Sequence, residues 1–403
     1  MNSIAITCPE NVSFALTRLK ERGHHAYAVG GCIRDTLLGL SPNDWDVTTS
    51  ALPEEILETF SDKHTIPTGL KHGTVTVMLN KEPIEITTFR IDGTYTDARR
   101  PTSVTFTDRV AEDLSRRDFT VNALAWNEAE GIVDCHDGIG DLERRIIRAV
   151  GVPEVRFGED ALRILRAYRF SAKLGFEIEE STRKALISEA YRLQNISRER
   201  IASEFCRLIT ASHATEALRM MQEDGIFPYI FGAEFTLCRD ILDQINTLPS
   251  DDFIYRLAFL LRGHREDLIR TWLNGLKLSN AQNDAILTLC DVQNLAKATP
   301  SPYSARFLLA KCGEFSLPLL EIAALHGIDT TETSALVTAA KENGDCVRIA
   351  DLRINGRDLI TAGLGKGPEI GRILSALLDA VLHDPTQNDR EALLALAKAL
   401  HNN

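Results

Sequence analysis

The sequence predicts an α+β domain followed by a long all-α region. Three observations lead to this prediction. Short β-branched runs alternate with turns up to about residue 150, and beyond that point apolar residues recur with a helical period. The chain has 403 residues, which is enough for two or more domains. We therefore expect a mixed N-terminal domain over 1–150 and helices through the remaining chain.

The strands expected in the N-terminal domain are short, rich in β-branched residues and bounded by Gly, Pro or Asn. They are AYAVGG (26–31), DWDVTT (44–49), GTVTVML (73–79) and IEITTFR (84–90). Two helices are expected beside them, because Pro stands near the start of an amphipathic stretch in both cases. These are PENVSFALTRLKERG (9–23) and LPEEILETFS (52–61).

The C-terminal region reads as a series of amphipathic helices. In EDALRILRAYRFSAKLGF (159–176), Leu162, Leu165, Tyr168 and Ala172 recur every three or four residues. Later segments keep this period and show few strand signals. Breaks between helical subdomains are expected at 249–252 and 298–304, although loops within one bundle would give the same pattern.

Composition excludes several classes of protein. No apolar run approaches the ~18 to 20 residues that a membrane helix needs. The N-terminus, MNSIAITCPENVSF, lacks the basic segment and long apolar core of a secretory signal. The eight cysteines are scattered, with no C-x-x-C pair and no zinc spacing. We expect a soluble cytoplasmic protein with reduced thiols.

The net charge of −12 argues at first against a nucleic-acid partner, because binding phosphates takes clustered Lys and Arg. The charge is unevenly distributed, however. Residues 1–150 carry 16 basic and 23 acidic groups, residues 151–210 carry 11 and 9, and residues 211–403 carry 18 and 25. Only the central segment is positive, so a nucleic acid would be expected there.

Two carboxylates, Asp44 and Asp46, stand two residues apart on the expected strand at 44–49. Alternate side chains of a strand share a face, so both would point one way and Trp45 would pack on the other side. Two carboxylates together repel unless a cation lies between them. Mg²⁺ suits such a pair, because it prefers a couple of carboxylates plus substrate phosphates. Glu85 could be a third acid, and a solvated turn is the alternative reading.

A glycine turn precedes the acids. Gly30 and Gly31 allow a close backbone turn after a strand, and a helix beginning near Cys32 would direct its free N–H groups at an anion. Arg34, one turn into that helix, adds a cation. The arrangement predicts a triphosphate site beside a metal site.

The sequence resembles a known family in six segments, over roughly residues 25–210. They are GGCIRDTLLGLSPNDWDVTT, IEITTFR, YTDARRP, EDLSRRDFTVNALAW, DGIGDLERRIIRAVG and RFGEDALRILRAYRFSAKLGF. Segments of this kind, in this order, are similar to those of the class II nucleotidyltransferases, which include the bacterial CCA-adding enzymes and poly(A) polymerases. The resemblance implies a polymerase-β-like catalytic head (1–150), a helical neck that selects nucleotides (151–210), and a helical body and tail that bind tRNA (211–403).

Within RRDFTVNALAW, Arg117 is a candidate phosphate ligand, and Asp118 and Asn122 are placed to hydrogen-bond a ribose. Such contacts would favour ribonucleotides over deoxyribonucleotides. A helix with an ion-paired surface is the competing interpretation.

In EDALRILRAYR, Asp160, Arg163, Arg166 and Arg169 follow one another at three-residue spacing and would form a polar stripe on one helix. A surface salt-bridge ladder would look the same. Cytosine and adenine, however, share an exocyclic amino donor beside a ring-nitrogen acceptor, so a carboxylate and a guanidinium can read both.

The resemblance implies that the carboxylate and guanidinium of this stripe are an amino-acid template, which we carry over to Asp160 and Arg163. Glu159 would restrain the arginine. Arg166 and Arg169 would line the nucleotide pocket or approach the RNA backbone.

The function implied is addition of C, C and A to a tRNA 3′ end from CTP and ATP, with Mg²⁺ and with release of pyrophosphate. A poly(A) polymerase or an A-only enzyme is the nearest alternative, and a CC-only enzyme is disfavoured because FRIDGTYTDARRP (89–101) is intact. A non-catalytic RNA-binding protein is a more remote alternative, and no appended His-Asp phosphohydrolase domain is seen. Neither DNA nor a membrane is expected as a partner, and the oligomeric state stays open, a homodimer included.

Overall fold

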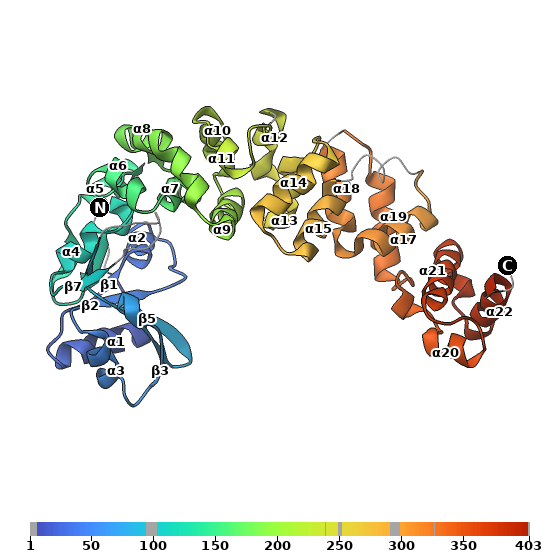
Figure 1. Ribbon diagram of the computed structural model, residues 1–403, viewed down its shortest axis with the longest axis horizontal. Helices are drawn as coiled ribbons and strands as arrows, with labels where there is room; N and C mark the ends of the chain where they lie inside the picture. Colours follow the sequence, from blue (N-terminus) through green and yellow to red (C-terminus); the bar gives the residue numbers. More distant parts are fainter. Residues whose placement is uncertain are drawn as a thin grey trace. The chain divides into compact units, whose positions relative to one another are not determined.

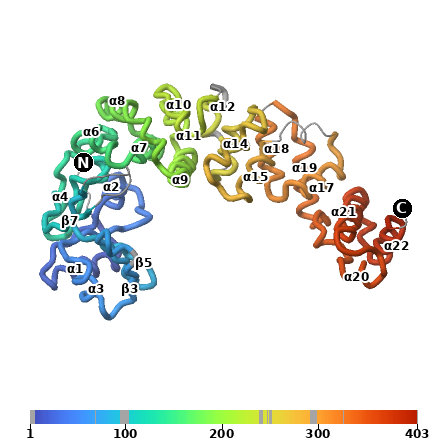
Figure 2. Tube along the Cα trace, in the orientation of Figure 1, coloured from blue at the N-terminus to red at the C-terminus, as the bar shows by residue number. Residues whose placement is uncertain are grey.

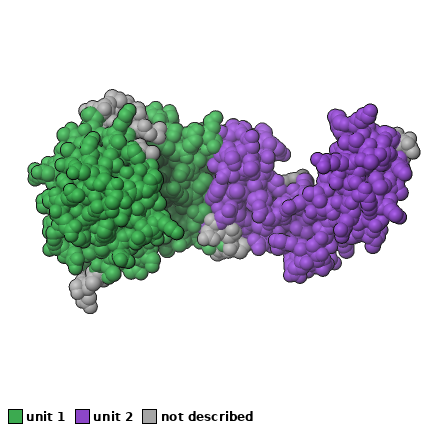
Figure 3. All heavy atoms as spheres, turned by 90° about the horizontal axis from the view of Figure 1, so that it is seen from below, with its two compact units in different colours: residues 1–249, 275–277 green, residues 250–274, 278–403 purple. Residues whose placement is uncertain are grey.

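The computed structural model describes residues 6–93, 103–237, 239–248, 252–290, 299–325 and 327–401. The chain divides into two compact units, residues 1–249 with 275–277 and residues 250–274 with 278–403 (Figure 3). The boundary after residue 249 falls at the first predicted break, whereas the second predicted break, at 298–304, lies within the second unit.

A seven-stranded sheet organises the first part of unit 1, in the order β3-β4-β5-β2-β1-β8-β9. Its strands are β1 (Ala26–Val29), β2 (Asp46–Thr49), β3 (His64–Gly69), β4 (Thr74–Leu79), β5 (Glu82–Thr88), β8 (Leu124–Asn127) and β9 (Gly131–Asp134). All neighbouring strands are antiparallel except β2 and β5. Because these two run parallel, their first residues lie at the same edge of the sheet.

Helices α1 (Glu10–Glu21) and α3 (Pro53–Thr59) contact each other and the sheet (Figure 1). Helix α3 starts as expected, with Pro53 at its first turn, and Glu55 accepts a hydrogen bond from the Leu52 N–H at 2.7 Å. Helices α2 (Gly31–Leu37) and α4 (Val110–Ser115) and the 3₁₀ turn η2 (Thr120–Asn122) complete the domain with the small hairpin β6 (Arg90–Asp92) and β7 (Val104–Phe106). One core cluster joins the sheet to α4 and comprises Tyr27, Val29, Phe89, Leu114, Ala123, Ala125 and Val150.

The rest of unit 1 is mostly helical. Its helices are α5 (Gly138–Arg144), α6 (Pro153–Glu159), α7 (Leu162–Leu174), α8 (Glu180–Glu189), η3 (Ala190–Asn195), α9 (Arg198–Ile209), α10 (Ala214–Glu223), α11 (Phe227–Ile230), α12 (Arg239–Gln244) and η4 (Ile245–Thr247). The predicted apolar positions of α7 are buried, and Gly175 ends the helix with a positive φ of 66°. A two-residue strand, β11 (Glu177–Ile178), pairs with β10 (Ile146–Ile147). The region beyond residue 158, which was expected to be helical, therefore also contains a short strand.

Unit 2 contains only helices among its described residues, and Figure 2 follows their path to the C-terminus. They are α13 (Phe253–Leu261), α14 (Glu266–Leu276), α15 (Asn280–Cys290), α17 (Pro302–Cys312), η5 (Gly313–Phe315), α18 (Ser316–Leu325), α19 (Thr331–Glu342), η6 (Ile349–Asp351), α20 (Gly356–Thr361), α21 (Pro368–His383), η7 (Pro385–Gln387) and α22 (Arg390–His401). Residues of the last three α-helices share one apolar cluster around Leu377 and Val381. The predicted fold class, an α+β head followed by a helical region, is confirmed. Within the described parts of the chain, every helix is too short or too polar to cross a membrane.

Candidate nucleotide and metal site

The three predicted acids gather where β2 and β5 begin. Val47 pairs with Ile86 in the parallel register, so Asp46 and Glu85, one residue earlier on each strand, are neighbours. Strand β2 begins at Asp46, which corrects the expectation that Asp44 lies on the same strand. Asp44 belongs to the preceding loop, and Trp45 is half-buried rather than packed in the core.

An open cavity of about 810 Å³ contains these acids. Its lining comprises Pro9, Asn11, Val12, Pro42, Asn43, Asp44, Trp45, Asp46, Glu82, Pro83, Ile84 and Glu85. The pKa of Asp46 is raised by partial loss of hydration and by the charges of Glu85 and Asp44, while Arg117 opposes that shift. A cation in the cavity would relieve this repulsion.

The donor set suits Mg²⁺, because carboxylate oxygens are the ligands that this ion prefers. No three His, Cys, Asp or Glu side chains among the described residues form a ready-made metal cage. Asp44 and Asp46 would hold such an ion together with substrate phosphates, which is the usual manner for Mg²⁺.

Gly30 makes the turn between β1 and α2, with φ of 84°. A Cβ atom at this position would lie 2.8 Å from Nη1 of Arg117, so the turn needs a glycine both for its backbone angle and for the close approach of the arginine. Helix α2 begins at Gly31, one residue before the expected start. A Cβ atom at Gly31 would lie 3.4 Å from Nη2 of Arg34.

Arg34 lies inside the protein, with only 3% of its surface exposed. Its Nε donates to Asp35 at 2.7 Å, and its Nη1 donates to the side-chain oxygen of Asn122. The guanidinium also lies over the Phe170 ring at 5.2 Å. Its charge is thus already compensated by protein groups, and a role in phosphate binding stays a prediction.

Arg117 follows α4 and is oriented by Asp113, a fully buried residue of that helix. Nη2 of Arg117 lies 3.4 Å from the Asp113 carboxylate, which Arg116 also contacts at 2.8 Å. Burial by itself raises the pKa of Asp113, but the charges of Arg116 and Arg117 outweigh it and lower the pKa overall. Nε of Arg117 is buried and has no hydrogen-bond partner among the described residues.

Asp118 and Asn122 bind each other, and Asp118 also binds Arg166 of α7. Oδ1 of Asp118 accepts from the Asn122 amide at 3.0 Å, and Oδ2 accepts two hydrogen bonds from Arg166. Burial opposes ionisation of Asp118, but Arg166 and Asn122 dominate and hold its pKa well below the usual range. Both predicted ribose contacts therefore already have protein partners.

Asp160 does not lie on a helix with the three arginines, which corrects the predicted four-residue stripe. Its backbone is extended (φ −140°, ψ 102°), between α6 and α7. Oδ1 accepts from the Leu162 N–H, two residues further along the chain, at 3.0 Å, and Oδ2 accepts from Nη2 of Arg200 at 2.7 Å.

Arg163 is held by three acceptors. Nη1 donates to Glu159 at 2.6 Å and to the Arg156 carbonyl at 3.1 Å, and Nη2 donates to the Arg116 carbonyl at 3.0 Å. The contact with Glu159 is the one expected from the sequence. A guanidinium has five N–H donors, so two remain for a ligand.

Arg166 and Arg169, one turn apart on α7, share a buried acid on α9. Nε of Arg169 donates to Glu204 at 2.5 Å, and Nη1 of Arg166 lies 3.8 Å from the other Glu204 oxygen. Both guanidinium groups also lie over the Phe170 ring, at 5.3 Å and 4.2 Å for Arg166 and Arg169.

Sequence reasoning missed Asp35, Asp113, Arg200 and Glu204. A signal existed for Glu204, because it stands among Ile201, Phe205 and Leu208 on the apolar face of an amphipathic segment, where a carboxylate needs a partner. No comparable signal marked Arg200, whose partner is 40 residues away in the sequence.

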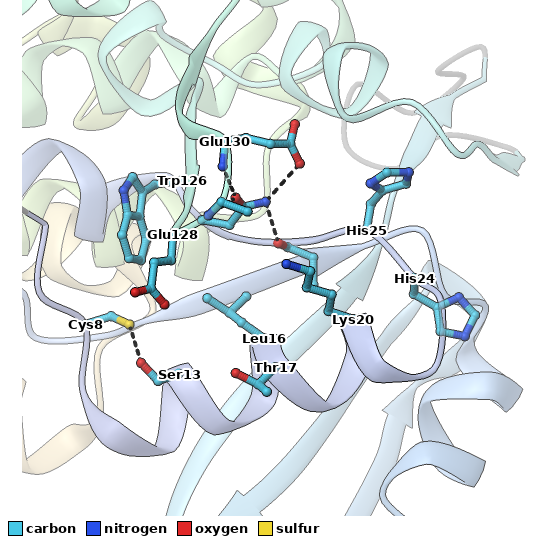
Figure 4. Close-up of a pocket in the computed structure, with 13 residues that line it drawn as sticks. Cys8, Ser13, Leu16, Thr17, Lys20, His24, His25, Trp126, Glu128 and Glu130 are labelled. Carbon is cyan, nitrogen blue, oxygen red and sulfur yellow. Dashed lines mark hydrogen bonds between the residues drawn. The ribbon is translucent and has the colours of Figure 1, made fainter.

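A second cavity, of about 240 Å³, lies between α1 and the β8–β9 hairpin (Figure 4). Lys20 and Leu16 of α1 face it, as do Trp126, Glu128 and Glu130. It shares no lining residue with the acidic cavity and contains none of the predicted site residues. In the segment FRIDGTYTDARRP, residues 94–101 lie outside the described residues.

Comparison with protein families gives three matches along the chain. Residues 26–148 match the poly(A) polymerase head domain. Residues 175–235 match a family described as "Probable RNA and SrmB-binding site of polymerase A", and residues 247–397 match tRNA nucleotidyltransferase domain 2.

Individual relatives extend these matches over nearly the whole chain. The CCA-adding enzyme of Leuconostoc mesenteroides is 38% identical over 391 residues, which cover 96% of this chain and 95% of that protein. The CCA-adding enzyme of Lactobacillus delbrueckii subsp. bulgaricus is 38% identical over 384 residues, or 94% of both chains. The crystal structure of the Bacillus stearothermophilus CCA-adding enzyme in complex with CTP matches with a TM-score of 0.82 and 32% identity over 98% of both chains.

Proposed function

The chain belongs to the CCA-adding enzymes, nucleotidyltransferases that complete the 3′ end of tRNA, and from this premise we propose how its residues perform the reaction. The enzyme adds C, C and A in sequence from CTP and ATP without a nucleic-acid template. At each step the terminal 3′ hydroxyl attacks the α-phosphate of the nucleotide, and pyrophosphate leaves.

The observation that supports the residue assignments most strongly concerns three consecutive residues, Arg116, Arg117 and Asp118. The Arg116 carbonyl accepts from Arg163, the Arg117 charge acts on Asp46, and Asp118 binds Arg166. This segment thereby holds two arginines of α7 and places the charge of Arg117 close enough to act on Asp46. A nucleotide bound there could offer its phosphates to the acids and its base to the neck.

We assign Asp44 and Asp46 as the ligands of Mg²⁺, with Glu85 as a third acid beside them. When bound, the metal activates the attacking hydroxyl and stabilises negative charge on the triphosphate. The shared place of the three acids in one cavity supports this assignment: burial and then the charges of Glu85 and Asp44 raise the pKa of Asp46, and a bound cation would relieve the part that is due to charge.

We assign base selection to Asp160 and Arg163. Each carboxylate oxygen of Asp160 accepts one hydrogen bond from the protein and has a second lone pair for an exocyclic amino group. Arg163 retains N–H donors for the ring nitrogen. Cytosine and adenine match both positions, whereas uracil and guanine present the opposite donor and acceptor.

The remaining assignments follow the sequence expectations. Gly30, Gly31, Arg34 and Arg117 contribute to triphosphate binding, and Asp118 and Asn122 contribute to the ribose contact. Glu159 restrains Arg163, the arginine that reads the base. Arg166 and Arg169 line the nucleotide pocket. Nε of Arg117 is buried and has no hydrogen-bond partner in the part of the chain that the structure describes, which supports its place among the phosphate ligands.

We further propose that residues 151–210 select the nucleotide and that residues 211–403 bind tRNA. Because residues 211–403 carry 18 basic and 25 acidic groups, local basic patches rather than net charge must contact the tRNA phosphates. We infer a cytoplasmic location from the nature of the substrate.

One assay tests this function. The protein is incubated with Mg²⁺ and a tRNA that lacks its 3′ CCA, with CTP and ATP supplied separately and together, and product length is measured. We expect two added residues with CTP alone and three with both nucleotides. Long adenylate tails on an unrelated RNA would contradict the proposal.

A further inference from the structure

The last three α-helices of unit 2, α20, α21 and α22, form a module with an apolar core of its own. The buried members of that core all lie between Cys346 and Ala397, and among the described residues none of them comes from helices α13–α19. We call residues 346–401 the end module. Helix α21 of this module contacts α17, and the two helices are neighbours in Figure 1. The α17–α21 contact therefore joins two parts of unit 2 that do not share this core.

Arg306 of α17 makes the joint with directed hydrogen bonds. Its Nε donates to the Leu382 carbonyl at 2.7 Å, and its Nη2 donates to the His383 carbonyl at 3.3 Å. Both carbonyls are at the C-terminal end of α21, where a helix leaves its carbonyl groups without partners and favours a cation. Nη1 of Arg306 lies 3.4 Å from the carboxylate of Asp345, which directly precedes the end module. One side chain thus holds both the entry to the module and the end of its longest helix.

Tyr303, one turn before Arg306 on α17, adds a second set of contacts with α21. Its ring stacks on the His383 ring, with centroids 3.6 Å apart and an angle of 12° between the planes. Its hydroxyl donates to Asp379, one turn earlier on α21, at 3.3 Å. Contacts with two positions one turn apart restrain the direction of α21 as well as its distance from α17.

The polar character of this joint needs an explanation. Arg306 is only 8% exposed, and burying a guanidinium group costs free energy unless the group is well paired. An apolar side chain of similar length would pack the two helices together without that cost. Hydrogen bonds differ from apolar packing because they have a preferred direction. A joint made from them fixes the angle between α17 and α21, and not only their contact.

We propose that Arg306 and Tyr303 are positioning residues for the RNA substrate: they hold the end module at the angle at which it and the rest of the enzyme contact one tRNA together. This inference rests on the proposed tRNA-binding role of residues 211–403. Two contacts with one ligand strengthen each other only when the geometry lets both form at once. A loose joint lowers the effective concentration of the second contact and leaves the catalytic residues unchanged.

The variants are Arg306→Met, Arg306→Lys and Tyr303→Leu. One control is Arg262→Met, which removes another buried arginine of unit 2, one whose guanidinium lies over the Phe259 ring at 3.6 Å. The other is Phe307→Leu, which removes an exposed aromatic ring from α17 itself. The measurement is kcat and KM for two RNAs, a full tRNA lacking its CCA end and a short hairpin that carries only the end of the acceptor stem. The thermal midpoint of each variant is measured as well.

For Arg306→Met we expect KM for the tRNA to rise about tenfold with kcat unchanged, because a linked contact loses effective concentration when its geometry is lost. KM for the hairpin should stay at the wild-type value, since so short an RNA uses the catalytic end alone. Arg306→Lys keeps the charge at the end of α21 without the planar fork, so its KM should be intermediate. Tyr303→Leu should also be intermediate, because Arg306 remains. Both controls should match the wild type.

The hairpin distinguishes positioning from general damage to the fold. A variant that is only less well folded would lose activity on both RNAs and would have a lower thermal midpoint. If Arg306→Met does not fold, Arg306→Lys and Tyr303→Leu decide the question. An unchanged KM for the tRNA in the folded variants would overturn the proposal. So would a rise in KM that is the same for the tRNA and the hairpin.

The wild-type enzyme separates this test from that of the function. If the wild type fails to add C and A to the tRNA, the proposed function itself is wrong. If the wild type has the same KM for the hairpin and the tRNA, the tRNA-binding role of residues 211–403 is wrong, and the positioning role is wrong with it. If the wild type prefers the tRNA and the Arg306 and Tyr303 variants prefer it equally, only the positioning role is wrong.

Discussion

Arg166 donates two hydrogen bonds to a single oxygen of Asp118, from Nε at 2.8 Å and from Nη2 at 2.5 Å. The pair joins helix α7 to the segment that follows α4, and Asp118 is almost fully buried. Its other oxygen accepts from Asn122 and from the Phe119 N–H. The carboxylate therefore keeps its charge inside the protein only because every oxygen has a partner.

This pair should make stability depend on pH. The pKa of Asp118 is lower in the folded state than the ordinary value of about 3.9, so its contribution is complete above that value and is lost as pH falls toward the folded pKa. Arg166→Gln should cost about 1–3 kcal/mol at pH 7. The difference in the free energy of unfolding between Arg166→Gln and the wild type should become smaller as pH falls below about 4. Urea midpoints between pH 7 and pH 3.5 measure it.

A matched control for this prediction is Arg219→Gln. Arg219 pairs with Asp243 at 2.8 Å, and both side chains are at least half exposed. An exposed pair contributes at most about 1 kcal/mol. An Arg166→Gln protein as stable as wild type at pH 7 would contradict the account.

Gly30→Ala should impair catalysis through Arg117. The added Cβ would lie 2.8 Å from Nη1 of Arg117, and the side chain would have to move. Gly23 is the control, because it has a similar φ of 86° and nothing within 4 Å of an added Cβ. Both variants should lose about 1–3 kcal/mol of stability for the unfavourable backbone angle. Only Gly30→Ala should reduce nucleotide addition, by about tenfold or more if one phosphate contact is lost.

The comparison of the two alanine variants decides this prediction. Steady-state addition of C to tRNA is measured for both at a temperature where both are folded. Equal activity of the Gly30 and Gly23 variants would show that the position of Arg117 does not depend on the absence of a Cβ atom at residue 30.

Removal of either proposed metal ligand should abolish activity without unfolding the protein. Asp44→Asn and Asp46→Asn keep the side-chain volume, and neither residue packs in the core. We expect nucleotide addition with Mg²⁺ to fall about a hundredfold or more, because the metal contributes several kcal/mol to the transition state. The affinity for Mn²⁺, measured by titration calorimetry, should also be lower in both variants than in the wild type.

Glu82→Gln is the control for the metal ligands. Glu82 lines the same cavity, but its carboxylate accepts from the Asn11 amide at 2.6 Å. That variant should bind Mn²⁺ as the wild type does. Near-normal turnover of either aspartate variant with Mg²⁺ would remove the metal assignment.

The sequence predicted much of this fold because local signals agreed with the final structure. Gly30 and Pro53 marked a turn and a helix start that the structure contains. Strand β3 was missed because HTIPTG includes a proline and lacks alternation. The turn at Asp160 was also missed, although an Asp side chain often forms a local turn by accepting from the backbone N–H two residues further on, as it does here.

The candidate site was less predictable than the fold, because its contacts join distant segments. Asp113 was not selected, although it is completely buried and orients Arg117. The link between Arg200 and Asp160 depends on how α9 packs on α7, and periodicity within one helix does not encode its neighbour. Asp44 was assigned to a strand because the D-x-D spacing fits one, but the preceding loop extends to Trp45.

Base selection by Asp160 and Arg163 is the central claim, and nucleotide discrimination tests it most directly. The measurement is kcat/KM for CTP, ATP, UTP and GTP with Asp160→Ala and Arg163→Ala on tRNA lacking its CCA end. The control variants are Glu180→Ala and Lys184→Ala, an exposed pair at 2.5 Å on α8.

A buried polar group left without a partner costs about 1–3 kcal/mol, so two mismatched positions give roughly 10² to 10⁴-fold discrimination in the wild type. We predict that both site variants incorporate C and A less efficiently and reject U and G less well, while both control variants keep the wild-type preference. Unchanged selectivity in Asp160→Ala and Arg163→Ala would contradict the account, and the two residues would then be an ordinary part of the salt-bridged surface of the neck.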